Sequence, residues 1–233
     1  VSSLLIAGRA ADRFGRRKVF LSGLLLYGTA GILAGSLPVI WVLILARSLQ
    51  GIAIAMLSPS GLAMSLNEFP PSRRAYALGV WGTIGALTGL CGSPVAAGMI
   101  ELFNWQAIFI LTGGFALLIF IAGFIVLSDK QEGNSQLPID WISAIFAVVA
   151  VGGLTLFLVQ GQEWGFSSPV TLLCLCVAII STPLLGKRNR TQRHPLFPPA
   201  IFAQRSFTIG AAGSALCQVG FFSIYFGLPL YMR

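Results

Sequence analysis

The stretch GRAADRFGRRKVFLSGLLLYGTAGILAG, Gly8 to Gly35, places a dense charge cluster directly before a long apolar run. Its first eleven residues contain one acid and five bases, and the part after Lys18 carries no charge. The chain as a whole is similar, since 56% of its 233 residues are hydrophobic and 9% are charged. Soluble domains carry about 25% charged residues, so this chain has too few to cover a water-facing surface. We therefore predict a membrane protein.

Seven charge-poor runs are long enough to cross a bilayer. A helix needs about 20 apolar residues to span the hydrocarbon core, and a spanning segment must satisfy its own backbone polar groups. The predicted fold class is an all-α membrane protein with complete spans at 19–36, 40–64, 75–99, 106–127, 141–160, 168–186 and 207–229. Val1 to Gly8 is too short to cross and is predicted to end a further helix, so the chain is expected to be truncated at both ends.

The bases predict the orientation of these spans. If the spans alternate, segments 9–18, 65–74, 128–140 and 187–206 share one side, and they hold every Lys and Arg except Arg47 and Arg233. The positive-inside rule places these segments in the cytoplasm, which predicts a multi-pass protein of a plasma or inner membrane. A nucleic-acid partner is not expected, because the bases form short islands between apolar runs instead of one basic face.

The charge cluster contains more than a positive-inside loop requires. A positive-inside loop explains only why the bases are there. It does not explain Asp12 or the two flanking glycines. Gly15 can adopt positive φ and reverse the chain, so Asp12 and Arg16 can meet across the turn. The spacing G-x-x-x-D-R-x-G-R-R-K resembles the cytoplasmic loop between the second and third helices of the major facilitator superfamily. The resemblance implies a conformational-switch loop that comprises Gly8, Asp12, Arg13, Gly15, Arg16 and Arg17.

A second motif, LILARSLQGIAIA, places Arg47 inside a predicted span. An arginine there costs at least about 2.5 kcal/mol unless it faces a cavity or a partner. One interpretation is that it snorkels to the outer surface. The alternative is that it acts with Gln50 on the same helix face, where Gly51 permits close helix approach. The motif resembles the R-x-x-Q-G segment in the fourth helix of facilitator-type transporters, which implies a cavity-facing, proton-coupling site of Arg47, Gln50 and Gly51.

A third motif, GALTGLCGSPVAAG, lies in the next span. Its glycines form a small-residue stripe suited to helix contact, and Pro94 removes a backbone donor. Ordinary transmembrane packing is the alternative interpretation. The segment resembles the antiporter motif of the fifth facilitator helix, although Ser93 and Ala97 replace two of its glycines. The residues predicted to matter are Gly85, Gly89, Pro94 and Gly98.

The rest of the chain resembles one particular branch of this superfamily. NWQAIFIL, Asn104 to Leu111, is similar to the segment that opens the sixth helix of drug:proton antiporters, with Gln106 in place of an Arg. Two further spans follow that a twelve-helix plan lacks, so the chain resembles the fourteen-helix branch. The implied organisation is an N-terminal bundle at 1–127, a linker loop with two inserted helices at 128–186, a basic cytoplasmic loop at 187–206, and the first helix of the C-terminal bundle at 207–233.

The resemblance implies a secondary active transporter that exports drugs or other amphipathic molecules in exchange for protons, by alternating access. Two alternatives stay open, namely an exporter of another solute (a siderophore, an amino acid or an organic anion) and a membrane scaffold that does not transport. The expected partners are an amphipathic substrate, protons, the lipid bilayer and adaptor proteins of an efflux system.

Enzyme chemistry is not predicted, because the sequence has no P-loop, no Ser-His-Asp arrangement and no clustered carboxylates. No catalytic residue, metal site or cofactor is expected, and a proton gradient is the expected driving force. The seven acids are scattered, and none lies deep in a complete span. The proton-carrying acid is therefore expected in a segment outside this chain.

Overall fold

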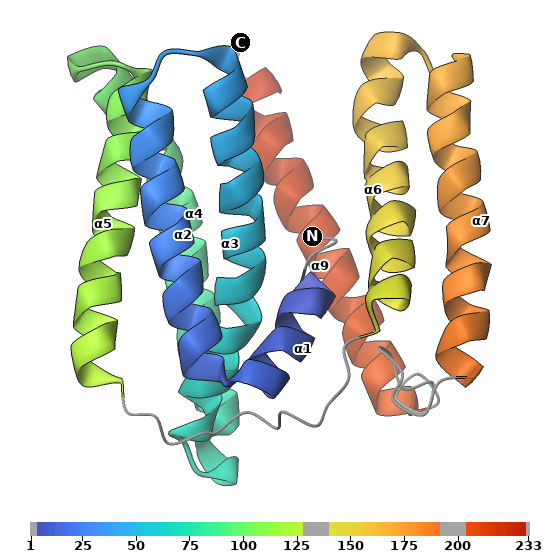
Figure 1. Ribbon diagram of the computed structural model, residues 1–233, viewed down its shortest axis with the longest axis horizontal. Helices are drawn as coiled ribbons and strands as arrows, with labels where there is room; N and C mark the ends of the chain where they lie inside the picture. Colours follow the sequence, from blue (N-terminus) through green and yellow to red (C-terminus); the bar gives the residue numbers. More distant parts are fainter. Residues whose placement is uncertain (1–3, 128–139, 192–203, 232–233) are drawn as a thin grey trace.

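Helices make up almost all of the described chain. The computed structural model describes residues 4–127, 140–191 and 204–231, and no strand occurs within these ranges (Figure 1). Its helices are α1 (Leu4–Phe14), α2 (Arg16–Ser36), α3 (Ile40–Asn67), α4 (Arg74–Leu102), α5 (Trp105–Val126), α6 (Trp141–Trp164), α7 (Pro169–Thr191) and α9 (Arg205–Tyr231). A 3-10 turn, η1 (Pro71–Arg73), precedes α4. The all-α fold class is therefore confirmed.

The predicted spans correspond to these helices one by one. Six helical segments among the described residues are long and apolar enough to cross a membrane, and they match the first six predicted spans. The seventh span corresponds to α9, in which Phe207–Phe221 is a shorter apolar stretch. The predicted ends are less accurate, since α7 continues to Thr191 instead of residue 186. Helical hydrogen bonding thus extends beyond the apolar run into polar flanking residues.

Two predicted loops are partly helical, which corrects their boundaries. In segment 9–18, α1 continues to Phe14 and α2 begins at Arg16, so the preceding helix does not end at Gly8. In segment 187–206, the first five residues belong to α7, and residues 192–203 lie outside the described residues, as do 128–139. Basic side chains such as Arg13 stabilise the last turn of a helix through its dipole, so a run of bases does not by itself mark a loop.

The helices alternate in direction, as consecutive membrane spans do. The α1–α2 turn, η1, the last residues of α5 and α7, and the first residues of α6 and α9 lie at one end of the structure (Figure 1). The short links α2–α3, α4–α5 and α6–α7 lie at the opposite end. The described residues within or next to the four segments predicted to share one side therefore lie at the same end of the helices.

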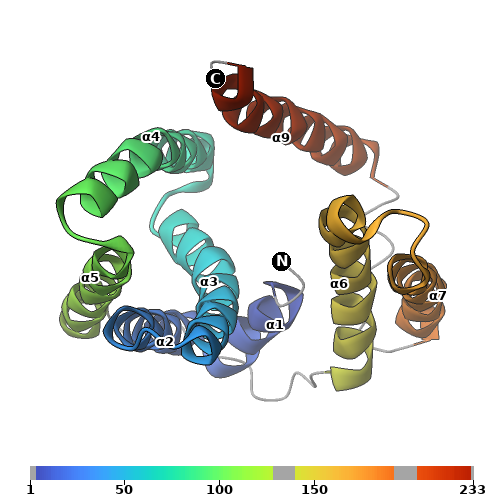
Figure 2. The same cartoon turned by 90° about the horizontal axis from the view of Figure 1, so that it is seen from above.

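Glycine allows α2 to pack tightly against α5. A Cβ on Gly31 of α2 would lie 2.9 Å from the Cα of Gly113 and 3.1 Å from the carbonyl oxygen of Phe109 in α5. One turn away, a Cβ on Gly35 would lie 2.8 Å from the carbonyl oxygen of Gln106. Small residues let transmembrane helices approach closely and gain dispersion energy. Because α3 also packs on α2, this central helix fixes the positions of both neighbours (Figure 2).

The helices α6 and α7 form a separate hairpin. They pack mainly against each other, and Figure 2 shows them beside the group formed by α2 to α5. Their contact uses small side chains, since Ala144, Ala147 and Ala178 are almost fully buried. A Cβ on Gly153 of α6 would lie 2.8 Å from the carbonyl oxygen of Cys174 in α7. The inserted pair predicted from the sequence is therefore a self-packed unit.

Candidate functional site

The turn between α1 and α2 consists of Gly15 alone. This residue has φ 95° and ψ 136°, a region that side chains rarely adopt, which confirms the predicted positive φ. Its N–H donates to the carbonyl of Ala11 at 3.0 Å, and its carbonyl accepts from Val19 at 3.2 Å. Gly15 therefore closes one helix and opens the next. Gly8 does not flank a loop, because it lies inside α1 with open space beside it.

Three arginines flank the turn, and each makes a different contact. Arg16 lies 3.6 Å from Asp12, measured from Nη2 to Oδ1, so the predicted pair across the turn is confirmed. The Asp12 side chain is 49% exposed and the Arg16 side chain 30%, which makes this a loose surface ion pair. Arg17 donates from Nη2 to the carbonyl oxygen of Phe124 at 3.0 Å. That carbonyl belongs to the last turn of α5, where carbonyls lack helical donors, so Arg17 joins the turn to another helix end.

Arg13 makes a more local contact. Its guanidinium carbon lies 5.3 Å from the ring centroid of the adjacent Phe14. The structure therefore gathers five of the six predicted switch residues, all except Gly8, at one end of α1 and α2, and it adds the C-terminus of α5 to them.

Arg47 lies against an aromatic ring of α5. It is the eighth residue of α3, about 10 Å from the helix start at 1.5 Å per residue. Its guanidinium carbon stands 4.3 Å from the ring centroid of Phe109. The side chain is exposed, and its recorded contact is with this ring instead of a carboxylate. Sequence reasoning missed Phe109, because it lies 62 positions after Arg47 on another helix, and such a contact leaves no local pattern in the sequence.

Gln50 follows Arg47 by three residues but is buried. Only 3% of it is exposed, and its Nε2 lies 3.3 Å from where a Cβ on Gly31 of α2 would stand. Its Oε1 has no hydrogen-bond partner among the described residues. Gly51 is exposed with open space beside it, so the close approach predicted there is not made between described helices. Arg47 and Gln50 thus reach α5 and α2 respectively.

The glycine stripe of α4 does not form the predicted helix contact between described helices. A Cβ at Gly85, Gly89, Gly92 or Gly98 would meet no atom within 4 Å, and α4 continues through Pro94. Ala77 is the buried residue of this helix, since α4 packs lightly against its neighbours. The close glycine contact occurs instead at Gly31 and Gly113. Small residues permit close packing but do not identify the partner, which depends on the arrangement of the other helices.

A second ion pair joins the two helices of the hairpin. Asp140 precedes α6 and accepts from the backbone N–H groups of Ile142 and Ser143. Arg188, in the last turn of α7, donates to its two carboxylate oxygens from Nε and Nη2, at 3.1 Å each. The Asp140 side chain is only 13% exposed. Burial raises the pKa of this carboxyl, but the hydrogen bonds from Arg188 and Ser143 outweigh it and lower the pKa from 3.8 to about 2.

This pair was also missed from the sequence. An Asp directly before an apolar run is a helix N-cap signal, so the hydrogen bonds of Asp140 to α6 could have been found. Its partner stands 48 residues away, in a segment predicted to be loop, and no spacing rule connects the two.

The family model of the Major Facilitator Superfamily matches residues 1–233 of this chain. The chain belongs to this superfamily. The resemblance carried by the G-x-x-x-D-R-x-G-R-R-K spacing is thereby confirmed.

Curated relatives of this facilitator chain are drug resistance and export proteins. The puromycin resistance protein of Streptomyces alboniger is 30% identical over 99% of this chain and 46% of its own length. The tetracenomycin C resistance and export protein of Streptomyces glaucescens is 27% identical over 99% of this chain and 43% of its own length. The multidrug export protein EmrB of Escherichia coli K12 is 28% identical over 97% of this chain and 43% of its own length. The chain spans less than half the length of these relatives.

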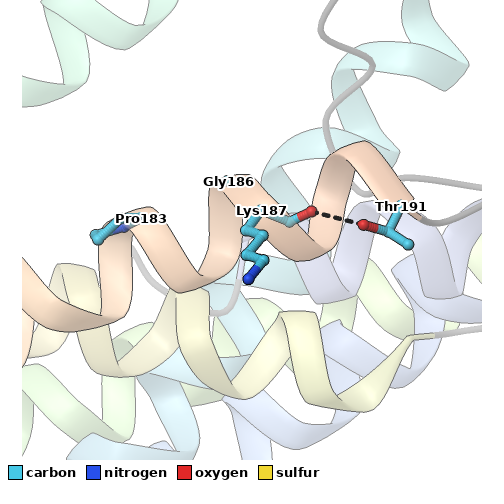
Figure 3. A pocket seen from close by; sticks show the side chains of 4 residues that line it. All are labelled: Pro183, Gly186, Lys187 and Thr191. Atoms are coloured by element: carbon cyan, nitrogen blue, oxygen red, sulfur yellow. Dashed lines mark hydrogen bonds between the residues drawn. The ribbon is translucent and has the colours of Figure 1, made fainter.

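Superfamily membership and the six membrane-length apolar helices make this a multi-pass membrane protein. At one end of α7 its surface has an open groove of about 430 Å³, lined by Pro183, Gly186, Lys187 and Thr191 (Figure 3). The Thr191 hydroxyl donates to the Lys187 carbonyl at 3.0 Å, along the helix. Small-molecule sites have enclosing apolar walls, so this facilitator's substrate site is not assigned to the groove.

Proposed function

We propose that the chain comprises the N-terminal bundle, the inserted helix pair and the first helix of the C-terminal bundle of a secondary active transporter. This transporter exports drugs or other amphipathic molecules in exchange for protons. The observation that carries this proposal is the similarity of 97–99% of the chain to resistance and export proteins. The proposed transporter works by alternating access and is driven by the proton gradient. It is proposed not to be an enzyme and to need no cofactor. Adaptor proteins of an efflux system are further proposed partners.

Arg47 is proposed to couple the proton to the substrate, with Gln50 and Gly51 as part of the same site. Placing a charged group inside a membrane span costs at least about 2.5 kcal/mol, so the presence of Arg47 there indicates a function. Its guanidinium rests on a ring, which leaves its N–H donors available for a carboxylate. The proton-carrying acid is proposed to lie in a segment outside this chain.

The α1–α2 turn is proposed to act as a latch between access states. The Asp12–Arg16 pair is loose and exposed, and such pairs contribute only about 0.2–1 kcal/mol. Breaking it is therefore inexpensive, and a new partner from another helix can replace it. A latch of this kind changes the populations of two states rather than the stability of the fold. Pro94 and the outward-facing glycines of α4 are proposed to contact segments outside this chain.

The sidedness of the protein is part of the proposal, with the α1–α2 turn in the cytoplasm. It is tested by single cysteines in a full-length protein whose native cysteines are replaced. Phe14 is 54% exposed at the proposed cytoplasmic end, and Trp41 is 75% exposed at the opposite end. An impermeant thiol reagent added to intact cells should label Trp41→Cys and not Phe14→Cys. The reverse pattern would contradict the orientation.

The function itself is tested with the full-length protein in inside-out proteoliposomes. An acidic lumen should drive the uptake of an amphipathic dye, and a protonophore should abolish it. Arg47→Ala should lose gradient-driven uptake, whereas Arg73→Ala, an exposed arginine in η1, should retain it. Uptake that does not depend on the gradient would contradict proton coupling. Normal uptake by Arg47→Ala would contradict the role of Arg47.

A further inference from the structure

The contact between Arg47 and Phe109 joins two helices that otherwise make few direct contacts. Both α3 and α5 pack against α2, which lies between them (Figure 2). The guanidinium of Arg47 crosses from α3 to within 4.3 Å of the Phe109 ring centroid. At that distance the negative face of the ring attracts the cation, and the attraction strengthens where water is excluded. Phe109 is therefore the group against which Arg47 rests.

Phe109 is itself held in place from several sides. It is 8% exposed and belongs to a buried cluster with Ala30 and Ala34 of α2 and Ala46 of α3. The Trp105 ring stands edge-on to it, with centroids 5.8 Å apart and planes at 87°. The backbone is equally constrained, because a Cβ on Gly31 would lie 3.1 Å from the Phe109 carbonyl oxygen. The ring is thus a closely packed surface on which the exposed Arg47 rests.

An aromatic ring holds a guanidinium differently from a carboxylate. A carboxylate accepts hydrogen bonds from two N–H groups in a fixed fork geometry, as Asp140 does from Arg188. A ring face attracts the charge and leaves the five N–H donors without an assigned direction. An acceptor is also close along the chain, since the buried Oε1 of Gln50 has no partner among the described residues. Arg47 can therefore change partner without first breaking a strong ion pair.

We propose that Phe109 is a positioning residue for proton coupling, because its ring holds Arg47 in a rest position from which the guanidinium moves to a carboxylate. This inference rests on the proposed role of Arg47 and adds a residue to that site. The Phe109 side chain acts through Arg47 and does not need to contact the substrate. Its aromatic face, and not its bulk, is the required property.

The test compares variants of the full-length protein in inside-out proteoliposomes. Phe109→Leu keeps an apolar side chain but removes the ring, and Phe109→Tyr keeps the ring. Phe120→Leu is the matched control, since Phe120 also lies on α5, packs against a buried cluster and pairs with Phe124. Three quantities are measured: gradient-driven uptake of an amphipathic dye, dye exchange without a gradient, and the unfolding temperature.

Phe109→Leu should lower gradient-driven uptake about fivefold, the change expected for loss of one cation–π contact. Dye exchange and the unfolding temperature should match those of Phe120→Leu, and Phe109→Tyr should restore uptake. Normal uptake by Phe109→Leu, an equal loss in Phe120→Leu, or failure of Phe109→Tyr to restore uptake would overturn the inference. Arg47→Ala is measured in parallel. If it loses uptake while Phe109→Leu does not, the inference fails and the proposed role of Arg47 stands. If Arg47→Ala transports normally, the proposed role of Arg47 fails.

Discussion

Arg47 and Arg188 are both arginines of membrane-length helices, but they are held in opposite ways. Arg188 donates to both oxygens of Asp140 at 3.1 Å, and the Asp140 side chain is almost buried. Arg47 is exposed and rests on the Phe109 ring, with 4.3 Å between the guanidinium carbon and the ring centroid. Arg188 closes the α6–α7 hairpin, whereas Arg47 bridges α3 and α5.

We propose that the same side chain serves structure at Arg188 and coupling at Arg47. The donors of Arg188 that face Asp140 are committed to a carboxylate that also caps α6, so breaking this pair leaves a partly buried acid without its partner and loosens two helix ends. A guanidinium on a ring keeps its donors and can accept a new partner. We therefore expect Arg188 variants to change stability and Arg47 variants to change coupling.

The largest expected change in stability follows from Arg188→Ala. Removing one partner from this partly buried pair should destabilise the full-length protein by about 2–3 kcal/mol, because Asp140 loses two charge-assisted hydrogen bonds. Thermal unfolding in detergent measures this, with Lys187→Ala in the open groove as the control. Dye uptake per folded protein should be retained. An Arg188→Ala protein that unfolds like the parent would remove the structural side of the comparison.

The same pair predicts a dependence of stability on pH. The pKa of Asp140 is lowered from 3.8 to about 2 in the folded protein, which corresponds to about 2 kcal/mol. Because the folded state favours the ionised carboxylate, this contribution is present above about pH 4 and is lost as the pH falls toward 2. Unfolding measured between pH 6 and pH 2 should show this loss. Asp140→Asn should lack that part of the slope, and an unchanged slope would contradict the assignment.

Gly15→Ala extends the comparison to the switch turn. The substituted residue would have to keep φ 95°, which should destabilise the turn by about 1–2 kcal/mol and reduce uptake. Gly8→Ala is the matched control, since Gly8 is helical with open space beside it and should tolerate alanine. Unfolding and dye uptake of the two variants check this. Equal behaviour of the pair would mean that the turn does not require its glycine.

Asp12→Asn should have the smallest effect on stability. An exposed ion pair at 3.6 Å contributes little, so we expect a change within about 0.5 kcal/mol. Dye uptake should nevertheless fall about tenfold, since a change of about 1.4 kcal/mol in the balance of access states has that effect. Normal uptake by a well-expressed Asp12→Asn protein would reduce the charge cluster to a topology signal.

The features of this structure that were predictable from the sequence depend on residues close together in the chain. Apolar run lengths identified the spans, because the bilayer thickness fixes the number of residues required. The Asp12–Arg16 pair and the positive φ of Gly15 were predicted because both involve residues four or fewer positions apart. Helix ends were less predictable, since hydrogen bonding continues through residues such as Arg188 after the apolar run has ended.

The contacts that were missed are all between helices. Arg47 meets Phe109 and Arg188 meets Asp140 across large separations in sequence, and no periodicity encodes such a pairing. The glycines are the clearest case. Similar spacings occur in α2 and α4, yet Gly31 lies against α5 and Gly89 lies in open space. Only the arrangement of the helices distinguishes them.

Substrate-induced proton release tests the central claim, that Arg47 couples protons to the substrate, most directly. Purified full-length protein in weakly buffered detergent solution is mixed with an amphipathic substrate, and the released protons are measured with a pH dye. We expect release by the parent protein, none by Arg47→Ala and partial release by Arg47→Lys, because lysine keeps the charge but lacks the planar donor fork. Undiminished proton release by Arg47→Ala would contradict the account.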